Sequence, residues 1–125
     1  NLRITKKIIW IDYAENIKEL FNISDVFCLT SEYEGLGLVL LESLYLKKPI
    51  ITVKKSAMNE IIKDSYNGIS LKNNFTSKDL SNCLTKLKID KIFRNRIVKN
   101  GKTELKYKFS VEKMYNQTQQ IYINS

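Results

Sequence analysis

Two glutamates and two glycines lie close together in the chain and are the residues best suited to chemistry. Glu34 and Glu42 have seven residues between them, and Gly35 and Gly37 are among those seven. A carboxylate accepts hydrogen bonds from hydroxyl groups, and glycine lets the backbone approach a ligand closely. This stretch therefore carries groups that can bind a diphosphate beside the hydroxyls of a sugar or a ribose.

The elements on either side decide where those groups point. An apolar run from Asp25 to Leu29 predicts a strand, and the helix-forming residues after Gly37 predict a helix that ends near Leu46. A strand, a glycine loop and a helix in this order direct free backbone N–H groups and the positive end of the helix dipole at one point. We expect an anion to bind there.

Glu42 lies on a segment that is apolar nearly all round, which predicts a buried carboxylate. A buried carboxylate is costly unless it is paired or hydrogen-bonded. Ligand hydroxyls would satisfy it, and so would a neighbouring side chain or a loop N–H group. The residue types alone give these two interpretations about equal weight.

Strands and helices alternate along the first half of the chain. Strands are predicted at 8–11, 25–29, 50–53 and 69–71, with helices after a capping box at Asp12 and Glu15, after Gly37, and at 56–62. The alternation predicts an α/β fold, a Rossmann-like parallel sheet flanked by helices, with ligands at the carboxyl ends of the strands. Three helices follow: one capped by Thr76 and Asp79, one ended by Gly101, and one begun at Ser110.

Length and composition limit the functional classes. The 125 residues are enough for a single domain. No stretch approaches the roughly 18 apolar residues of a membrane span, and no signal peptide is visible, so we expect a cytoplasmic protein. Cys28 and Cys83 look like buried small hydrophobes of a reducing compartment. The chain contains no histidine, which argues against zinc, iron and copper sites and excludes histidine-based catalysis within it.

Positive charge is concentrated in the segment from Lys86 to Lys108. It holds nine basic residues and two acidic ones, whereas the whole chain has a net charge of +8. One interpretation is a solvated helix face. The other is a surface that contacts anionic lipid headgroups, peripherally at a membrane. Nucleic acid is disfavoured because only Phe93 and Tyr107 offer aromatic rings among the basic residues.

The glutamate–glycine stretch resembles a known family. Glu34, Gly35, Gly37 and Glu42 match the Glu-Gly-x-Gly motif and the second glutamate of the retaining family 4 glycosyltransferases, which have the GT-B fold. The resemblance runs from about Ile8 to about Leu71, and the C-terminal end at Phe109 and Ser110 is also similar. The chain departs from the family at Thr30, where proline is usual, at Asp12 and Lys47, where glycine is usual, and at Ser56 and Ala57, where Gly-Gly is frequent.

The resemblance implies a role for each residue of the stretch. Glu34 would be catalytic and bind the sugar hydroxyls near the reacting carbon, and Glu42 would bind the ribose hydroxyls. Gly35 and the amides of Leu36, Gly37 and Leu38 would hold the diphosphate without a metal ion or other cofactor. Tyr13 would lie against the base.

The resemblance also implies partners beyond this chain. The co-substrate would be a nucleotide-diphosphate sugar, and the acceptor, a glycan or a lipid-linked molecule, would bind to a separate N-terminal domain. The isolated chain would then be an inactive fragment. Two alternatives stay open: a sugar-nucleotide epimerase of the same fold, and a non-catalytic module that binds a partner through its basic segment.

Overall fold

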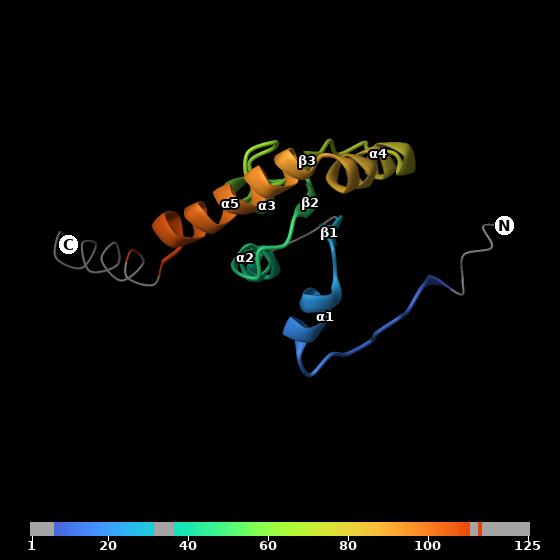
Figure 1. The fold of residues 1–125 in the computed structure, drawn as a ribbon, viewed down its shortest axis with the longest axis horizontal. Helices are drawn as coiled ribbons and strands as arrows, with labels where there is room; N and C mark the ends of the chain where they lie inside the picture. The colour runs from blue at the N-terminus through green and yellow to red at the C-terminus, as the bar shows by residue number, and fades with distance from the viewer. Residues whose placement is uncertain (1–6, 32–36, 111–112, 114–125) are drawn as a thin grey trace.

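A computed structural model describes residues 7–31, 37–110 and 113. Within these residues the chain alternates helices and strands before ending in two long helices (Figure 1). The elements are α1 Ile17–Ile23, β1 Phe27–Leu29, α2 Leu38–Tyr45, β2 Ile50–Val53, α3 Ser56–Ile61, β3 Ile69–Leu71, α4 Ser77–Ile89 and α5 Lys91–Lys108.

The described strands form one parallel sheet in the order β1-β2-β3. Phe27 pairs with Ile50, and Ile51 pairs with Ile69. All four residues of β2 are buried because this strand is central, and α2 and α4 lie on opposite sides of the sheet (Figure 1). The predicted parallel α/β fold is confirmed.

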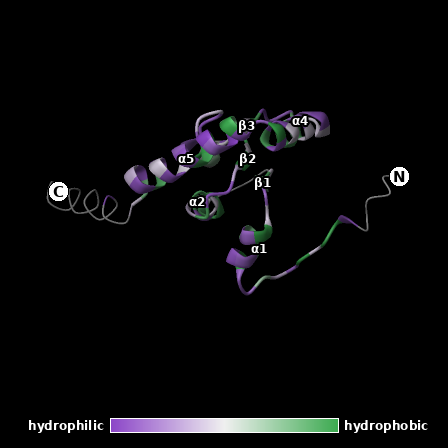
Figure 2. Ribbon diagram, in the orientation of Figure 1, coloured by the Kyte–Doolittle hydropathy of each residue, from purple (hydrophilic) through white to green (hydrophobic). Residues whose placement is uncertain are grey.

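The core is split by the sheet into two clusters. Side chains alternate between the faces of a strand, so neighbours on β2 enter different clusters. Ile50 packs with Leu40 and Leu44 of α2, whereas Ile51 packs with Leu87 of α4 and Ile97 of α5. Figure 2 shows hydrophilic residues recurring along α4 and α5, with hydrophobic residues between them.

Helix α5 contributes to both clusters. Phe93 and Ile97 belong to the cluster beside α4, and Leu105 and Phe109 pack against the cluster beside α2. The predicted helix end at Gly101 is wrong, because α5 continues to Lys108. Gly101 is buried, and a Cβ built there would lie 2.6 Å from Cδ2 of Leu44. The glycine therefore allows two helices to approach closely and does not end one.

The N-terminal prediction is also wrong. Residues 8–11 form no strand, and Ile9 and Trp10 are 84% and 85% exposed. A strand needs a hydrogen-bonding partner, and no strand is placed beside these residues in the described part of the chain. The capping box at Asp12 and Glu15 does not form either, since α1 begins at Ile17 and the side chain of Asn16 accepts from the N–H of Lys18.

Two further predictions concern local chemistry. The capping box of Thr76 and Asp79 is confirmed at the start of α4. Helix α3 begins at Ser56, as predicted, and Lys55 is its N-cap. Both cysteines are free, but Cys28 is exposed because β1 is an edge strand of the described sheet, while Cys83 is half-buried.

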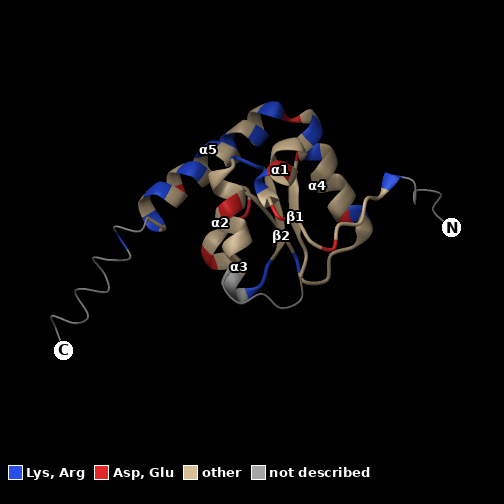
Figure 3. Ribbon diagram, turned by 90° about the horizontal axis from the view of Figure 1, so that it is seen from below, with Lys and Arg blue, Asp and Glu red and all other residues tan. Residues whose placement is uncertain are grey.

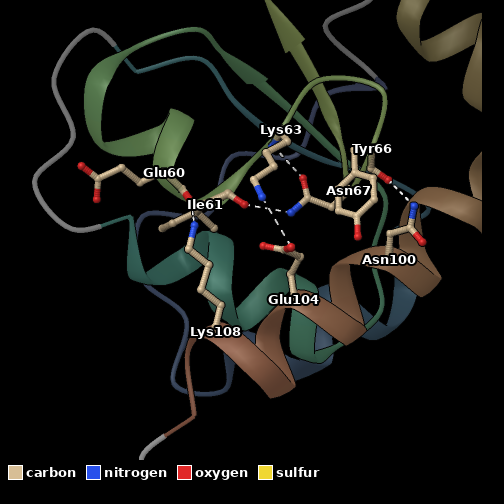
Figure 4. Close-up of polar contacts among 8 residues, drawn as sticks. All are labelled: Glu60, Ile61, Lys63, Tyr66, Asn67, Asn100, Glu104 and Lys108. Carbon is tan, nitrogen blue, oxygen red and sulfur yellow. Dashed lines mark hydrogen bonds and ion pairs between the residues drawn. The ribbon is translucent and has the colours of Figure 1, made fainter. Parts of the chain in front are cut away.

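A polar network ties α5 to the end of α3 and the turn that follows it (Figure 4). Asn67 is buried, its Oδ1 accepts from the N–H of Lys63 at 2.7 Å, and its Nδ2 donates to the carbonyl of Ile61 at 2.8 Å. From α5, Asn100 donates to the Tyr66 carbonyl, Lys108 donates to the Glu60 carbonyl, and Glu104 pairs with Lys63 at 3.5 Å. This network fixes the position of Ile61.

Candidate functional site

The glycine loop begins the candidate site, and the structure describes its last residue. Glu34, Gly35 and Leu36 lie outside the described residues, which resume at Gly37. Gly37 is the N-cap of α2 and has φ 58° and ψ 30°, a left-handed conformation that glycine adopts without strain. No side chain among the described residues caps this helix end. The first amides of α2 are thus left for another acceptor.

The space beside Gly37 is also tight. A Cβ at this position would lie 3.2 Å from Cδ1 of Ile61 and 3.3 Å from Cδ1 of Leu40. Ile61 is itself positioned by the hydrogen bond from Asn67 to its carbonyl. The packing of α3 therefore sets the position of the backbone at the start of α2.

Glu42 is exposed, so the prediction of a buried carboxylate is wrong. Helix α2 buries Leu40, Ser43 and Leu44, while Leu38 and Tyr45 are 61% and 67% exposed. An apolar sequence all round therefore does not give burial all round, because the helix packs through one side only. The side chain of Glu42 has no partner among the described residues, one helical turn from Leu38.

Two lysines lie at the end of the neighbouring strand. β1 and β2 are parallel, with Leu29 opposite Thr52, so their carboxyl ends share one edge of the sheet. Lys54 and Lys55 follow β2 at this edge, and the N–H of Lys54 donates to the carbonyl of Leu71 at 2.7 Å. Sequence reasoning did not select them. The sequence signal that could have identified them is a pair of lysines directly after a buried strand.

The remaining predicted site residue is not brought to this edge. Tyr13 is 81% exposed in a coil that leads away from α1 (Figure 1). A hollow elsewhere, beside β3 and α4, is lined by Asp64, Ser70 and Cys83 among others, and Gly37 does not line it. Over the described ranges, no group of three or more Cys, Asp or Glu residues could hold a metal ion.

An uncapped helix N-terminus with a left-handed glycine, and two lysines after β2, thus lie along the carboxyl edge of a parallel sheet. This arrangement can hold a diphosphate, and Glu42 beside it can accept hydrogen bonds from hydroxyl groups. Comparison with known families is consistent with this chemistry. The family described as "Glycosyl transferases group 1" matches residues 1–104. The chain belongs to this family.

Several members of the glycosyl transferases group 1 family are similar to nearly the whole chain. An N-acetyl-alpha-D-glucosaminyl L-malate synthase of Bacillus anthracis is 28% identical over 98% of this chain. A UDP-Gal:alpha-D-GlcNAc-diphosphoundecaprenol alpha-1,3-galactosyltransferase of Escherichia coli is 24% identical over 99% of it. The chain spans only 32% of the length of each of these two relatives.

Solved structures show the same fold. The C-terminal domain of a glycosyl transferase group 1 family protein of Francisella tularensis has a TM-score of 0.70 and 29% identity, over 83% of this chain and 53% of that one. Anabaena HepE in complex with UDP and glucose has a TM-score of 0.76 and 21% identity, over 86% of this chain and 29% of that one. The described sheet and helices are therefore part of a GT-B glycosyltransferase domain.

Proposed function

We propose that this chain is the donor-binding region of a retaining glycosyltransferase. The full-length enzyme moves a sugar from a nucleotide-diphosphate sugar to an acceptor held by a separate N-terminal domain. The observation that carries the proposal is the left-handed Gly37 at an uncapped helix end, on the carboxyl edge of a parallel sheet. Family membership and the UDP bound in a protein of the same fold support it.

The chemistry follows from charge. A nucleoside diphosphate leaves with developing negative charge, which preorganised N–H groups stabilise without reorganisation. In the proposal, Gly35 and the amides of Leu36, Gly37 and Leu38 bind the diphosphate. Lys54 and Lys55 supply positive charge at the same edge, so no metal ion is needed.

The two glutamates bind hydroxyl groups in the proposal. Glu34 contacts the sugar beside the reacting carbon, and Glu42 contacts the ribose. The exposure of Glu42 supports this role, because a carboxylate without a protein partner is available to a ligand. Tyr13 reaches the base only if the N-terminal coil takes a different position in the full-length enzyme.

We extend the proposal to the acceptor of the full-length enzyme and to the activity of the isolated chain. Two relatives are named for substrates linked to undecaprenol through a diphosphate, so we propose a lipid-linked acceptor for the full-length enzyme. The isolated 125-residue chain is inactive in this proposal, because the acceptor site lies outside it.

Glu42→Gln tests the proposed ribose contact. The variant keeps the size of the side chain and removes its charge, so the full-length enzyme should fold normally. Its affinity for UDP, measured by calorimetric titration with GDP and ADP run alongside to identify the base, should fall by about 1.5–3 kcal/mol, the range for hydrogen bonds to a charged group.

Glu60→Gln is the matched control, since Glu60 is also an exposed glutamate on a helix. It should leave nucleotide affinity unchanged. Equal affinity in the Glu42 variant and the wild type would remove Glu42 from the site. If the wild-type enzyme bound none of UDP, GDP and ADP, the proposed function would be refuted.

A further inference from the structure

The outward surface of α5 carries several exposed basic residues. Lys99 and Lys106 are seven residues apart, hence on one stripe, and Lys102 lies between them as a neighbour of both. All three are exposed, and Figure 3 shows basic residues recurring along the helix. Of the two acids of the segment, Asp90 is exposed at the corner between α4 and α5 and accepts from the N–H of Phe93 at 2.8 Å, and Glu104 faces Lys63.

Exposed apolar side chains adjoin this surface. Ile92 is one heptad before Lys99 and is 85% exposed, and Ile89, at the end of α4, is 73% exposed. With Asp90 and Lys91 they line a shallow hollow at the corner between α4 and α5. Large apolar side chains surrounded by lysines are typical of segments that lie in a membrane interface.

The aromatic residues argue against nucleic acid as the partner. Stacking on bases requires exposed rings among the cations. Phe93 is only 6% exposed, and its ring is covered by Nζ of Lys86 at 3.9 Å and by the guanidinium of Arg96 at 5.4 Å. Among the described residues of α5, Tyr107 is therefore the aromatic residue that is exposed.

We propose that the α4–α5 corner and the outward surface of α5 form a docking surface for an anionic lipid bilayer. Ile89 and Ile92 enter the headgroup region, and Lys99, Lys102 and Lys106 lie over lipid phosphates. Arg94 is excluded from this surface because it is half-buried and its guanidinium donates to the carbonyl of Leu87 at 3.3 Å.

The charge component is tested by vesicle co-sedimentation of the full-length protein. Vesicles of phosphatidylcholine alone are compared with vesicles that contain phosphatidylglycerol, at low and at high salt. Binding should require phosphatidylglycerol and weaken with salt, because the salt screens exposed charges. Lys99→Glu with Lys106→Glu should weaken binding at least about 20-fold, roughly fivefold for each lysine lost. Lys7→Glu with Lys18→Glu makes the same charge change on exposed residues elsewhere and should weaken it far less.

The apolar component has its own pair of variants. Ile89→Ser with Ile92→Ser should weaken binding to phosphatidylglycerol vesicles about tenfold at fixed salt, because less apolar surface leaves water. Ile9→Ser with Ile23→Ser is the control, since both of these residues are 84% exposed but lie far from α5 in the sequence. Circular dichroism verifies that each variant is folded.

Three results would overturn the proposal. The wild type could ignore phosphatidylglycerol vesicles at low salt, where attraction is strongest. The lysine variant could bind them as tightly as its control. A single-stranded RNA oligonucleotide could bind through Lys99 and Lys106 while the vesicles do not, which would assign the surface to nucleic acid. None of these results depends on nucleotide binding.

Discussion

Asn67 influences the candidate site indirectly, through Ile61. Its side chain is 2% exposed and satisfies two backbone groups, the N–H of Lys63 and the carbonyl of Ile61. Cδ1 of Ile61 in turn lies 3.2 Å from the position that a Cβ on Gly37 would take. The chain therefore uses one buried amide to hold the turn after α3 and, through Ile61, the start of α2.

Asn67→Ala should lower the free energy of unfolding by about 2 kcal/mol, because it leaves the buried carbonyl of Ile61 and the partly buried N–H of Lys63 without a partner. Urea denaturation of the full-length protein measures the loss. Asn95→Ala, an exposed change on α5, should stay within about 0.5 kcal/mol of the wild type. A loss no larger at Asn67 than at Asn95 would mean that water satisfies both groups.

At the scale of elements, the start of α4 makes stability depend on pH. The N–H of Thr76 donates to the Asp79 carboxylate at 2.8 Å and its hydroxyl donates at 2.7 Å. These bonds, the backbone bond first, lower the pKa of Asp79 from its ordinary value of about 3.9. A lowered folded pKa stabilises the fold above the unfolded pKa, and this stabilisation is lost as pH falls through the folded pKa.

Asp79→Asn should therefore be less stable than the wild type at neutral pH, and the difference should shrink below about pH 4. Thermal unfolding followed by circular dichroism from pH 7 to pH 2 measures this. The side chain is fully exposed, so the effect is small. Parallel curves for the two proteins across the whole range would show that the charge of Asp79 does not stabilise α4.

The contact between α2 and α5 depends on the absence of a side chain at Gly101. Gly101→Val should lower the free energy of unfolding by about 1–3 kcal/mol, because its Cβ would overlap Leu44 and separate the helices. Leu44→Ala removes the obstructing methyl groups. In urea denaturation, the double variant should lose less than the sum of the two single losses, since valine fills space that leucine vacated. Strict additivity would show that the two side chains do not compete.

At the scale of the whole molecule, α5 joins two surfaces with different chemistry. Its inner side packs on α2 and on the polar network around Asn67, which position Gly37. Its outer side carries Lys99 and Lys106, which are exposed. The proposed nucleotide site, at α2 and after β2, and the proposed lipid surface, on α4 and α5, thus lie on different elements.

The two surfaces should be separable by mutation. Lys99→Glu with Lys106→Glu should leave the affinity of the full-length protein for UDP within about twofold of the wild type, because exposed charges more than about 10 Å away are screened at 0.1 M salt. The same calorimetric titration measures it. A much larger loss would mean that the basic surface and the nucleotide site are electrostatically coupled.

Local sequence patterns predicted the start of a helix, which satisfies its own hydrogen bonds, and the strand at the centre of the sheet. The apolar run at Ile50–Val53 became the buried strand β2, and the capping box of Thr76 and Asp79 began α4. The glycine at the start of α2 was also predicted, since a strand–glycine–helix order is a local signal. The roles assigned to Glu34 and Glu42 stay predictions.

Only the tertiary structure decided what depends on neighbours distant in sequence. The isoleucines at 8–11 need a partner strand and remain exposed, and Glu42 is exposed because α2 packs through one side. Gly101 lies inside α5 because Leu44, far away in the chain, requires its small size. Lys54 and Lys55 join the site because parallel pairing brings the end of β2 to the edge where β1 ends. Periodicity specifies which face of an element is apolar, but burial is a property of pairs of elements.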